Sequence, residues 1–171
     1  MASSAATGVV VWITGLPSSG KSTFAGRIQA RLRDAGRPAV VLDGDEVRRA
    51  LVPTPGYTPE ARDAFYATLA RLAALVAGQG FVVVVPATAH RAAYRAEARA
   101  LAPRFVEVYV AAPAEECRRR DAKGLYAAET TGLPDMPGAG VAYEPPEAPE
   151  VVASGGQDDD AAERVVALLT G

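Results

Sequence analysis

The sequence of 171 residues is short of the features that mark secreted, membrane-spanning or nucleic-acid-binding proteins. It has one cysteine, Cys117, so an intrachain disulfide is excluded and a reducing, cytoplasmic setting is expected. Residues 1–8 lack the basic head and long apolar run of a signal peptide. The longest apolar runs, 9–13 and 81–85, fall far short of the ~20 residues that cross a bilayer. With 18 basic and 20 acidic residues the net charge is −2, which gives no electrostatic reason to expect nucleic acid or membrane as a partner.

Two polar residue types are scarce. Of the 18 basic residues only Lys21 and Lys123 are lysines, and the other 16 are arginines. Asparagine is absent altogether. Guanine-specific switch proteins carry an Asn-Lys-x-Asp or Thr-Lys-x-Asp element, whereas Lys123 is followed by glycine and leucine. These scarcities weigh against a guanine-reading protein.

What the sequence does contain is a regular alternation of apolar runs and amphipathic stretches. The β-branched run 9–14 predicts a strand buried on both faces. Further strands are expected at 39–42, 81–85 and 105–110, with a short edge strand at 151–152. Helices are expected at 22–35, 59–77, 91–101 and 113–120, and after the acidic residues 158–160. This alternation predicts one α/β domain, 1–171, with an open, mostly parallel sheet and helices on both faces.

Residues 122–156 interrupt this alternation, because they are rich in glycine and proline and contain only one short apolar pair. A connection of that length inside a compact domain is usually functional. We expect a lid at 122–149, whose closure would exclude water from a reacting phosphoryl group.

A phosphate-binding motif lies between the first predicted strand and the first predicted helix. Residues 15–22, Gly-Leu-Pro-Ser-Ser-Gly-Lys-Ser, match G-x-x-x-x-G-K-[ST] in the strand-loop-helix context that this motif requires. The glycines let backbone N–H groups face phosphate oxygens, Lys21 would bridge the β- and γ-phosphates, and Ser22 would ligate Mg²⁺. The fold is therefore expected to be the three-layer P-loop NTPase fold. The expected ATP-binding residues are Gly15, Ser18, Ser19, Gly20, Lys21, Ser22, Thr23 and Arg120.

Two acidic residues follow the second predicted strand. Asp43-Gly44-Asp45 falls at the carboxyl edge of the sheet, where open α/β sheets bind ligands. A carboxylate there could orient an acceptor hydroxyl or hold the water shell of a metal ion. The alternative is a turn that starts a helix with Asp45 as its N-cap. The small size and the expected lid favour a small-molecule kinase over a switch protein.

Several motifs together resemble the adenylylsulfate (APS) kinase family. They are Leu42-Asp43-Gly44-Asp45-Glu46-Val47-Arg48, Gly56-Tyr57-Thr58 with Arg62, Cys117, Arg120-Asp121, Lys123-Gly124-Leu125-Tyr126 and Tyr143-Glu144-Pro145-Pro146. The resemblance covers nearly the whole chain. It implies transfer of the γ-phosphoryl group of MgATP to the 3′-hydroxyl of adenylyl sulfate, and a homodimer.

The resemblance also assigns roles to individual positions. Asp45, with Asp43 beside it, corresponds to the carboxylate near the acceptor hydroxyl. Arg48 and Arg62 match arginines that hold the phosphosulfate, and a guanidinium fork suits such oxyanions. Lys123 matches a lid lysine. Cys117 matches a family cysteine and is expected to be a packing residue.

The acceptor side departs from the family pattern. Tyr57 replaces a phenylalanine but can still stack on a base, whereas Phe65 replaces an oxyanion-binding asparagine. Residues 86–91, which include Thr88 and His90, replace Phe-Ile-Ser-Pro-Tyr-Arg, and Met136 replaces a lid phenylalanine. His90 is either an acceptor contact or general base, or a hydrogen-bonded structural residue.

Each lost hydrogen bond or stacking contact of this kind weakens the binding free energy of the acceptor by about 1–3 kcal/mol. Two acceptors therefore stay open: adenylyl sulfate, or a different small acceptor such as a nucleotide conjugate or a biosynthetic intermediate. A plain ATPase and a non-catalytic nucleotide-binding module are the remaining alternatives.

Overall fold

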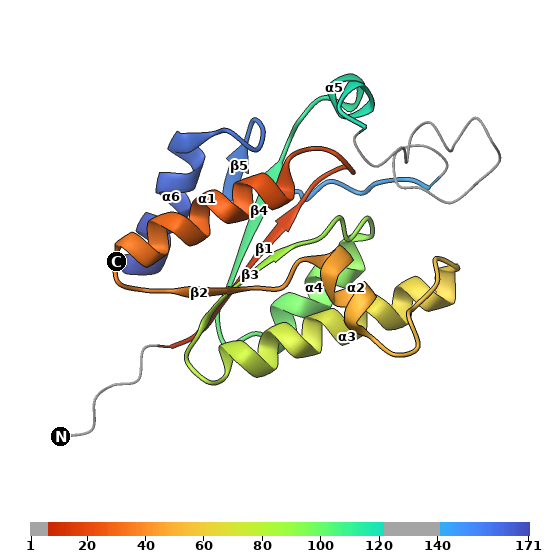
Figure 1. Cartoon of the computed structure of the whole chain (residues 1–171), viewed down its shortest axis with the longest axis horizontal. Helices are drawn as coiled ribbons and strands as arrows, with labels where there is room; N and C mark the ends of the chain where they lie inside the picture. Colours follow the sequence, from red (N-terminus) through yellow and green to blue (C-terminus); the bar gives the residue numbers. More distant parts are fainter. Residues whose placement is uncertain (1–6, 122–140) are drawn as a thin grey trace.

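Five parallel strands form the centre of the molecule (Figure 1). The computed structural model describes residues 7–121 and 141–171. The strands are β1 (Val9–Thr14), β2 (Ala39–Val41), β3 (Val82–Pro86), β4 (Phe105–Val110) and β5 (Val151–Ala153). Their order is β2-β3-β1-β4-β5, and every pairing within these residues is parallel. The predicted open parallel sheet is confirmed, with β5 at its edge as expected.

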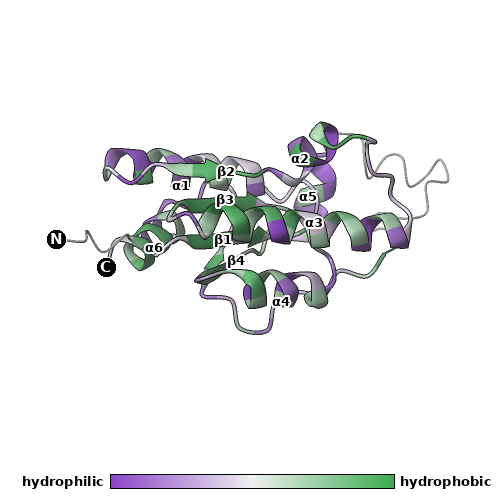
Figure 2. Cartoon of the chain, turned by 90° about the horizontal axis from the view of Figure 1, so that it is seen from below, coloured by the Kyte–Doolittle hydropathy of each residue, from purple (hydrophilic) through white to green (hydrophobic). Residues whose placement is uncertain are grey.

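Helices cover both faces of this sheet (Figures 1 and 2). On one face lie α1 (Lys21–Asp34) and α6 (Asp159–Thr170). On the other lie α3 (Pro59–Ala77) and α4 (Ala92–Leu101). Two short helices, α2 (Gly44–Ala50) and α5 (Ala114–Arg119), follow β2 and β4. The three-layer arrangement predicted from the sequence is thereby confirmed.

The central strand β1 supplies both halves of the core, since successive side chains point to opposite faces. Val11 and Ile13 pack in the cluster that includes residues of α1 and α6. Val10 and Trp12 pack in the cluster that includes residues of α3 and α4. All six residues of β1 are buried, so no face of this strand meets water. Burying one such aliphatic side chain contributes about 1.5–3 kcal/mol, which explains why the run reads as continuously apolar.

The first turn of α6 is capped by Asp158, as the acidic start of that segment predicts. Its carboxylate accepts hydrogen bonds from the N–H of Ala161 at 2.9 Å and from the N–H and hydroxyl of Ser154 at 2.9 and 3.0 Å. These donors, the Ser154 N–H foremost, lower the pKa of Asp158. The Asp158 carboxylate thus holds the first turn of α6 against Ser154, the residue that follows β5.

Replacing Asp158 by alanine should lower the free energy of unfolding by about 1 kcal/mol at pH 7. Because the folded-state pKa is depressed, the cap contributes fully above the unfolded pKa and is lost as the pH falls through the folded one. The deficit, measured by urea unfolding, should therefore shrink in acid. The control is Glu163→Ala, an exposed position on the same helix. Equal losses in both variants at pH 7 would contradict this assignment.

Within residues 7–121 and 141–171, no helix has both the length and the apolar character needed to cross a membrane.

Candidate active site

The phosphate loop joins β1 to α1 at the carboxyl edge of the sheet, as the motif predicts. Gly20 is the N-cap of α1 and has a left-handed backbone with φ of 100°. A Cβ atom there would lie 2.7 Å from the backbone nitrogen of Gly156, so the site accepts only glycine. Ser18 is also left-handed, with φ of 61°. This close approach also brings the loop between β5 and α6 against the phosphate loop.

Lys21 folds back over the phosphate loop. Its ammonium nitrogen donates to the carbonyl oxygens of Gly15 at 3.0 Å and Leu16 at 2.7 Å. The hydroxyl of Ser19 is buried and has no hydrogen-bond partner among the described residues. The loop thus places a cation and the N-terminus of a 14-residue helix at one point, which is the electrostatic pattern that binds phosphate.

A pair of oxygen ligands lies beside the loop. The hydroxyl of Ser22 donates to Oδ2 of Asp43 at 2.7 Å, although the two residues are 21 positions apart in the sequence. Hydroxyl and carboxylate oxygens are the hard ligands that Mg²⁺ prefers, and Mg²⁺ usually keeps several waters and substrate phosphates as its other ligands. Ser22 and Asp43 therefore fit a magnesium ion at this place.

Asp43 also caps α2, which corrects one expectation. Its Oδ1 accepts from the backbone N–H of Asp45 at 2.9 Å and of Glu46 at 3.3 Å, so Asp43 and not Asp45 is the N-cap. Asp45 lies in the first turn of this helix. The alternative of a helix capped by Asp45 is wrong, because the helix starts at Gly44, whereas a helix capped by Asp45 would start at Glu46.

Four of the residues predicted to bind the acceptor come together. The guanidinium carbon of Arg48 lies 3.9 Å from the ring centre of Phe65 and 4.5 Å from that of Tyr57. Its Nη1 donates to the carbonyl of Gly56 at 2.7 Å. Arg62 lies 6.0 Å from the Tyr57 ring. Both arginines are buried, so two cations are held in fixed positions, Arg48 on α2 and Arg62 on α3.

Phe65 has a different role from the one that its sequence position suggests. The replacement of an oxyanion-binding amide by a ring predicts a lost polar contact. In the structure the ring packs under Arg48, where a cation over an aromatic face is attractive by about 0.5–2 kcal/mol. Phe65 thus fixes the orientation of Arg48 where the amide would offer a hydrogen bond to a ligand.

Tyr66, the neighbour of Phe65, was not singled out from the sequence. Its hydroxyl accepts the backbone N–H of Ala89 at 3.0 Å, which ties α3 to the loop after β3. Burial raises the pKa of Tyr66, and the charges of Arg48, Arg62 and Asp45 all reach it. These three charges therefore act on the buried Tyr66 hydroxyl. A tyrosine within a helical apolar stripe gives no sequence signal for this contact.

The loop after β3 holds Thr88 and His90. The carbonyl of Thr88 accepts a hydrogen bond from Thr14 at 2.6 Å. His90 is buried and packs edge-on against Tyr94 at 5.4 Å and Tyr66 at 6.4 Å. Burial, followed by the charge of Arg62, lowers the pKa of His90, so the imidazole is neutral at pH 7. Its Nδ1 has no partner among the described residues, and its contact with the acceptor stays a prediction.

Four further residues considered in the sequence lie in or beyond α5. Lys123 and Met136 fall outside the described residues. Arg120 bonds to Glu116 at 3.1 Å, and its contact with ATP stays a prediction. Cys117 is fully buried against Ala112, and burial raises the pKa of its thiol. The packing role expected for Cys117 is confirmed.

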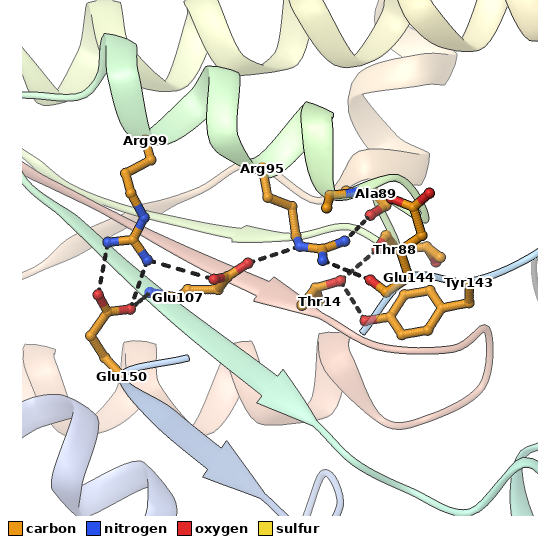
Figure 3. Close-up of polar contacts among 10 residues, drawn as sticks. Thr14, Thr88, Ala89, Arg95, Arg99, Glu107, Tyr143, Glu144 and Glu150 are labelled. Carbon is orange, nitrogen blue, oxygen red and sulfur yellow. Dashed lines mark hydrogen bonds and ion pairs between the residues drawn. The ribbon is translucent and has the colours of Figure 1, made fainter. Parts of the chain in front are cut away.

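A buried polar network beside the phosphate loop was missed by sequence reasoning (Figure 3). Its centre is Arg95, which is 3% exposed and donates to Glu107 at 2.8 Å and to the carbonyls of Ala89 at 2.6 Å and Glu144 at 2.7 Å. Tyr143 joins the same region through its hydroxyl. Tyr143 and Glu144 belong to a motif noted in the sequence, but an arginine in an alanine-rich helix carries no sign of burial.

Comparisons with known proteins agree with this geometry. A family model described as adenylylsulphate kinase matches residues 7–154. The adenylyl-sulfate kinase of Paraburkholderia xenovorans (strain LB400) is 44% identical over 151 residues, which cover 87% of this chain and 84% of that protein. A bifunctional enzyme NodQ of Azospirillum brasilense is 42% identical over 165 residues, which cover 94% of this chain and 27% of that protein.

A solved structure extends the likeness to three dimensions. The Mycobacterium tuberculosis APS kinase CysC in complex with AMPPNP and APS superposes with a TM-score of 0.88 at 34% identity, over 97% of this chain and 99% of that chain. The residues matched by the family model, 7–154, include the phosphate loop, α2 and the arginine pair. On this evidence the chain belongs to the adenylylsulfate kinase family, and it is a P-loop kinase.

Proposed function

We propose that this kinase transfers the γ-phosphoryl group of ATP to the 3′-hydroxyl of adenylyl sulfate in a reaction that requires Mg²⁺. The observation that carries the proposal is the 2.7 Å hydrogen bond between Ser22 and Asp43. It joins the phosphate loop to α2, the helix that also holds Asp45 and Arg48. The groups suited to ATP and the groups suited to an anionic acceptor are therefore held against each other.

The residues of the phosphate loop divide the work on ATP. Lys21 would leave the carbonyls of Gly15 and Leu16 to bind the β- and γ-phosphates. Its positive charge would there stabilise the negative charge that develops on the phosphate oxygens during transfer. Ser22 and Asp43 would hold Mg²⁺, which supplies neutralisation of the phosphate charge when bound. The N-terminus of α1 adds its dipole to the same site.

The acceptor residues orient the hydroxyl that attacks. Asp45, which lies in the turn of α2 that Asp43 caps, would accept the proton of that hydroxyl. Arg48 and Arg62 would bind the phosphosulfate, since both are buried cations held in fixed orientations. Holding two reactants in this way converts a bimolecular step into an effectively unimolecular one.

A second candidate is a different anionic acceptor with a hydroxyl group. The observation in its favour is Phe65, whose ring occupies the face of Arg48 where the family pattern has an oxyanion-binding amide. A pocket altered in this way would keep the ATP side and accept another phosphorylated or sulfated compound. Such an acceptor would stimulate ADP release where adenylyl sulfate does not.

The expected result is that adenylyl sulfate strongly stimulates ADP release from MgATP by the purified protein. The physical reason is that water, which the arginine pair does not position, is a poor competitor for the phosphoryl group. ADP release is measured by a coupled assay with and without adenylyl sulfate. A rate that is the same in both conditions would indicate a plain ATPase, and the absence of ADP release with all acceptors tried would indicate a non-catalytic binding module.

A further inference from the structure

A hydrogen-bond chain connects three segments that are far apart in the sequence (Figure 3). The hydroxyl of Thr14 donates to the carbonyl oxygen of Thr88 at 2.6 Å. The same hydroxyl lies 2.8 Å from the hydroxyl of Tyr143, 129 positions away. Because a hydroxyl has a single proton and Thr14 gives it to Thr88, Tyr143 must be the donor in the second bond. The chain thus runs from Tyr143 through Thr14 to Thr88.

The environment of Tyr143 keeps it a donor. Burial raises the pKa of Tyr143 to about 12, so its hydroxyl stays protonated over the whole range in which the protein works. Its ring stacks on Tyr109 of β4 with a centroid separation of 6.2 Å. Thr14 is fully buried, so water cannot substitute for either bond. The hydroxyl of Tyr143 therefore has one defined task.

The backbone around Tyr143 is fixed by independent contacts. The N–H of Glu144 donates to the carbonyl of His90 at 2.8 Å, and the carboxylate of Glu144 accepts the N–H of Ala92 at the start of α4 at 2.6 Å. Arg95 donates to the carbonyls of Ala89 and Glu144. Residues 143–144 are thus fastened to the loop after β3, and only the Tyr143 hydroxyl reaches across to β1.

Two members of this hydrogen-bond chain, Thr14 and Thr88, lie at the two halves of the active site. Thr14 directly precedes Gly15, the first residue of the phosphate loop. Thr88 lies in the loop that carries His90, and Tyr66 connects this loop to α3, the helix that carries Arg62. A shift of this loop relative to the phosphate loop would change the distance between acceptor and phosphoryl group. Errors of about 1 Å in such positions can cost roughly 10²-fold in rate.

We propose that Tyr143 is a positioning residue, which sets the register between the phosphate loop and the acceptor loop 87–91 through Thr14 and Thr88. The inference rests on the proposed function, since it concerns alignment of the acceptor with the transferred group. Tyr143 touches neither substrate in this account. Removal of the Tyr143 hydroxyl should therefore slow phosphoryl transfer but leave ATP binding intact.

The test is Tyr143→Phe, which removes one hydroxyl and keeps the stacking on Tyr109. The matched control is Tyr94→Phe, which removes a 2.6 Å hydrogen bond to Asp63 that joins α4 to α3. We expect Tyr143→Phe to lower kcat about tenfold with adenylyl sulfate, to leave the Kd for ATP within about twofold, and to raise the share of ADP formed without transfer. Tyr94→Phe should leave all three unchanged. If the share of ADP formed without transfer is the same in wild type and in Tyr143→Phe, the proposal is wrong.

A second measurement does not depend on the acceptor. Hydrogen-deuterium exchange of the unliganded protein should be faster in residues 86–91 and 14–20 of Tyr143→Phe than of wild type, because the Thr14 hydroxyl loses its donor. Tyr94→Phe should not change residues 14–20. If wild type fails to phosphorylate adenylyl sulfate, the proposed function is wrong but exchange still tests the register. Unchanged exchange in both segments of Tyr143→Phe would overturn the positioning role whatever the acceptor is.

Discussion

Replacing Lys21 by methionine should lower phosphoryl transfer by roughly 10²–10³-fold, the usual cost of losing one group aimed at developing charge. Methionine keeps the length and apolar stem of the side chain but removes the ammonium, which lies within 3.0 Å of the carbonyls of Gly15 and Leu16. Those contacts hold the cation at the mouth of the loop, where the β- and γ-phosphates would bind. The rate is measured as adenylyl sulfate-dependent ADP release at saturating MgATP.

The matched control for Lys21 is Arg33→Met, an exposed cation near the other end of α1. It changes the net charge of the protein equally but is distant from the phosphate loop. We expect Arg33→Met to retain full activity, and we expect both variants to unfold at temperatures close to that of wild type. Full activity in folded Lys21→Met would mean that the loop does not bind the transferred phosphate.

Replacing Arg95 by methionine should lower the free energy of unfolding by about 3–5 kcal/mol, the range seen when one partner of a buried ion pair is removed. The guanidinium makes three hydrogen bonds and is 3% exposed. Without it the carboxylate of Glu107 loses its 2.8 Å bond and keeps the longer ion pair to Arg99 at 3.5 Å. The carbonyls of Ala89 and Glu144 also lose their donor. Urea unfolding followed by circular dichroism measures the loss.

Two comparisons separate burial from charge in this network. Arg99→Met removes a cation that pairs with Glu150 at 2.7 Å but is 42% exposed, so its cost should stay within about 1 kcal/mol. The double variant Arg95→Met, Glu107→Leu removes both buried charges and should recover part of the loss. A loss for Arg95→Met no larger than that for Arg99→Met would contradict the role given to Arg95 as the centre of the network.

The parts of the fold that are read from the sequence are those where one pattern has one physical cause. The continuous run 9–14 predicts β1, because only a strand covered on both faces needs apolar residues at every position. Spacing of apolar residues by three and four predicts α1 and α3 within one or two residues. The sequence indicates α2 only as one of two alternatives, since seven residues are too few to show a period and Asp43 reads equally as a turn residue.

The candidate active site likewise has one part that the sequence predicts and one part that it does not. The phosphate loop is contiguous, so its residues and their order are visible in the sequence, and its strand-loop-helix context is confirmed. The acceptor side is assembled from α2, α3 and the loop after β3, and the packing of Phe65 under Arg48 exists only once these elements meet. Arg95 shows the limit most clearly, because arginine is a residue type expected at the surface and only its contacts with other segments explain why it is buried beside Tyr94 and Ala98 on α4.

The most direct test of the account is the identity of the phosphorylated product. After incubation of the protein with MgATP and adenylyl sulfate, phosphorus NMR should show a new phosphomonoester on the 3′-oxygen, formed in equal amount with ADP. The 3′-deoxy analogue of adenylyl sulfate should give no such signal. A phosphomonoester formed equally with the 3′-deoxy analogue, or ADP accompanied only by inorganic phosphate, would contradict transfer to the 3′-hydroxyl.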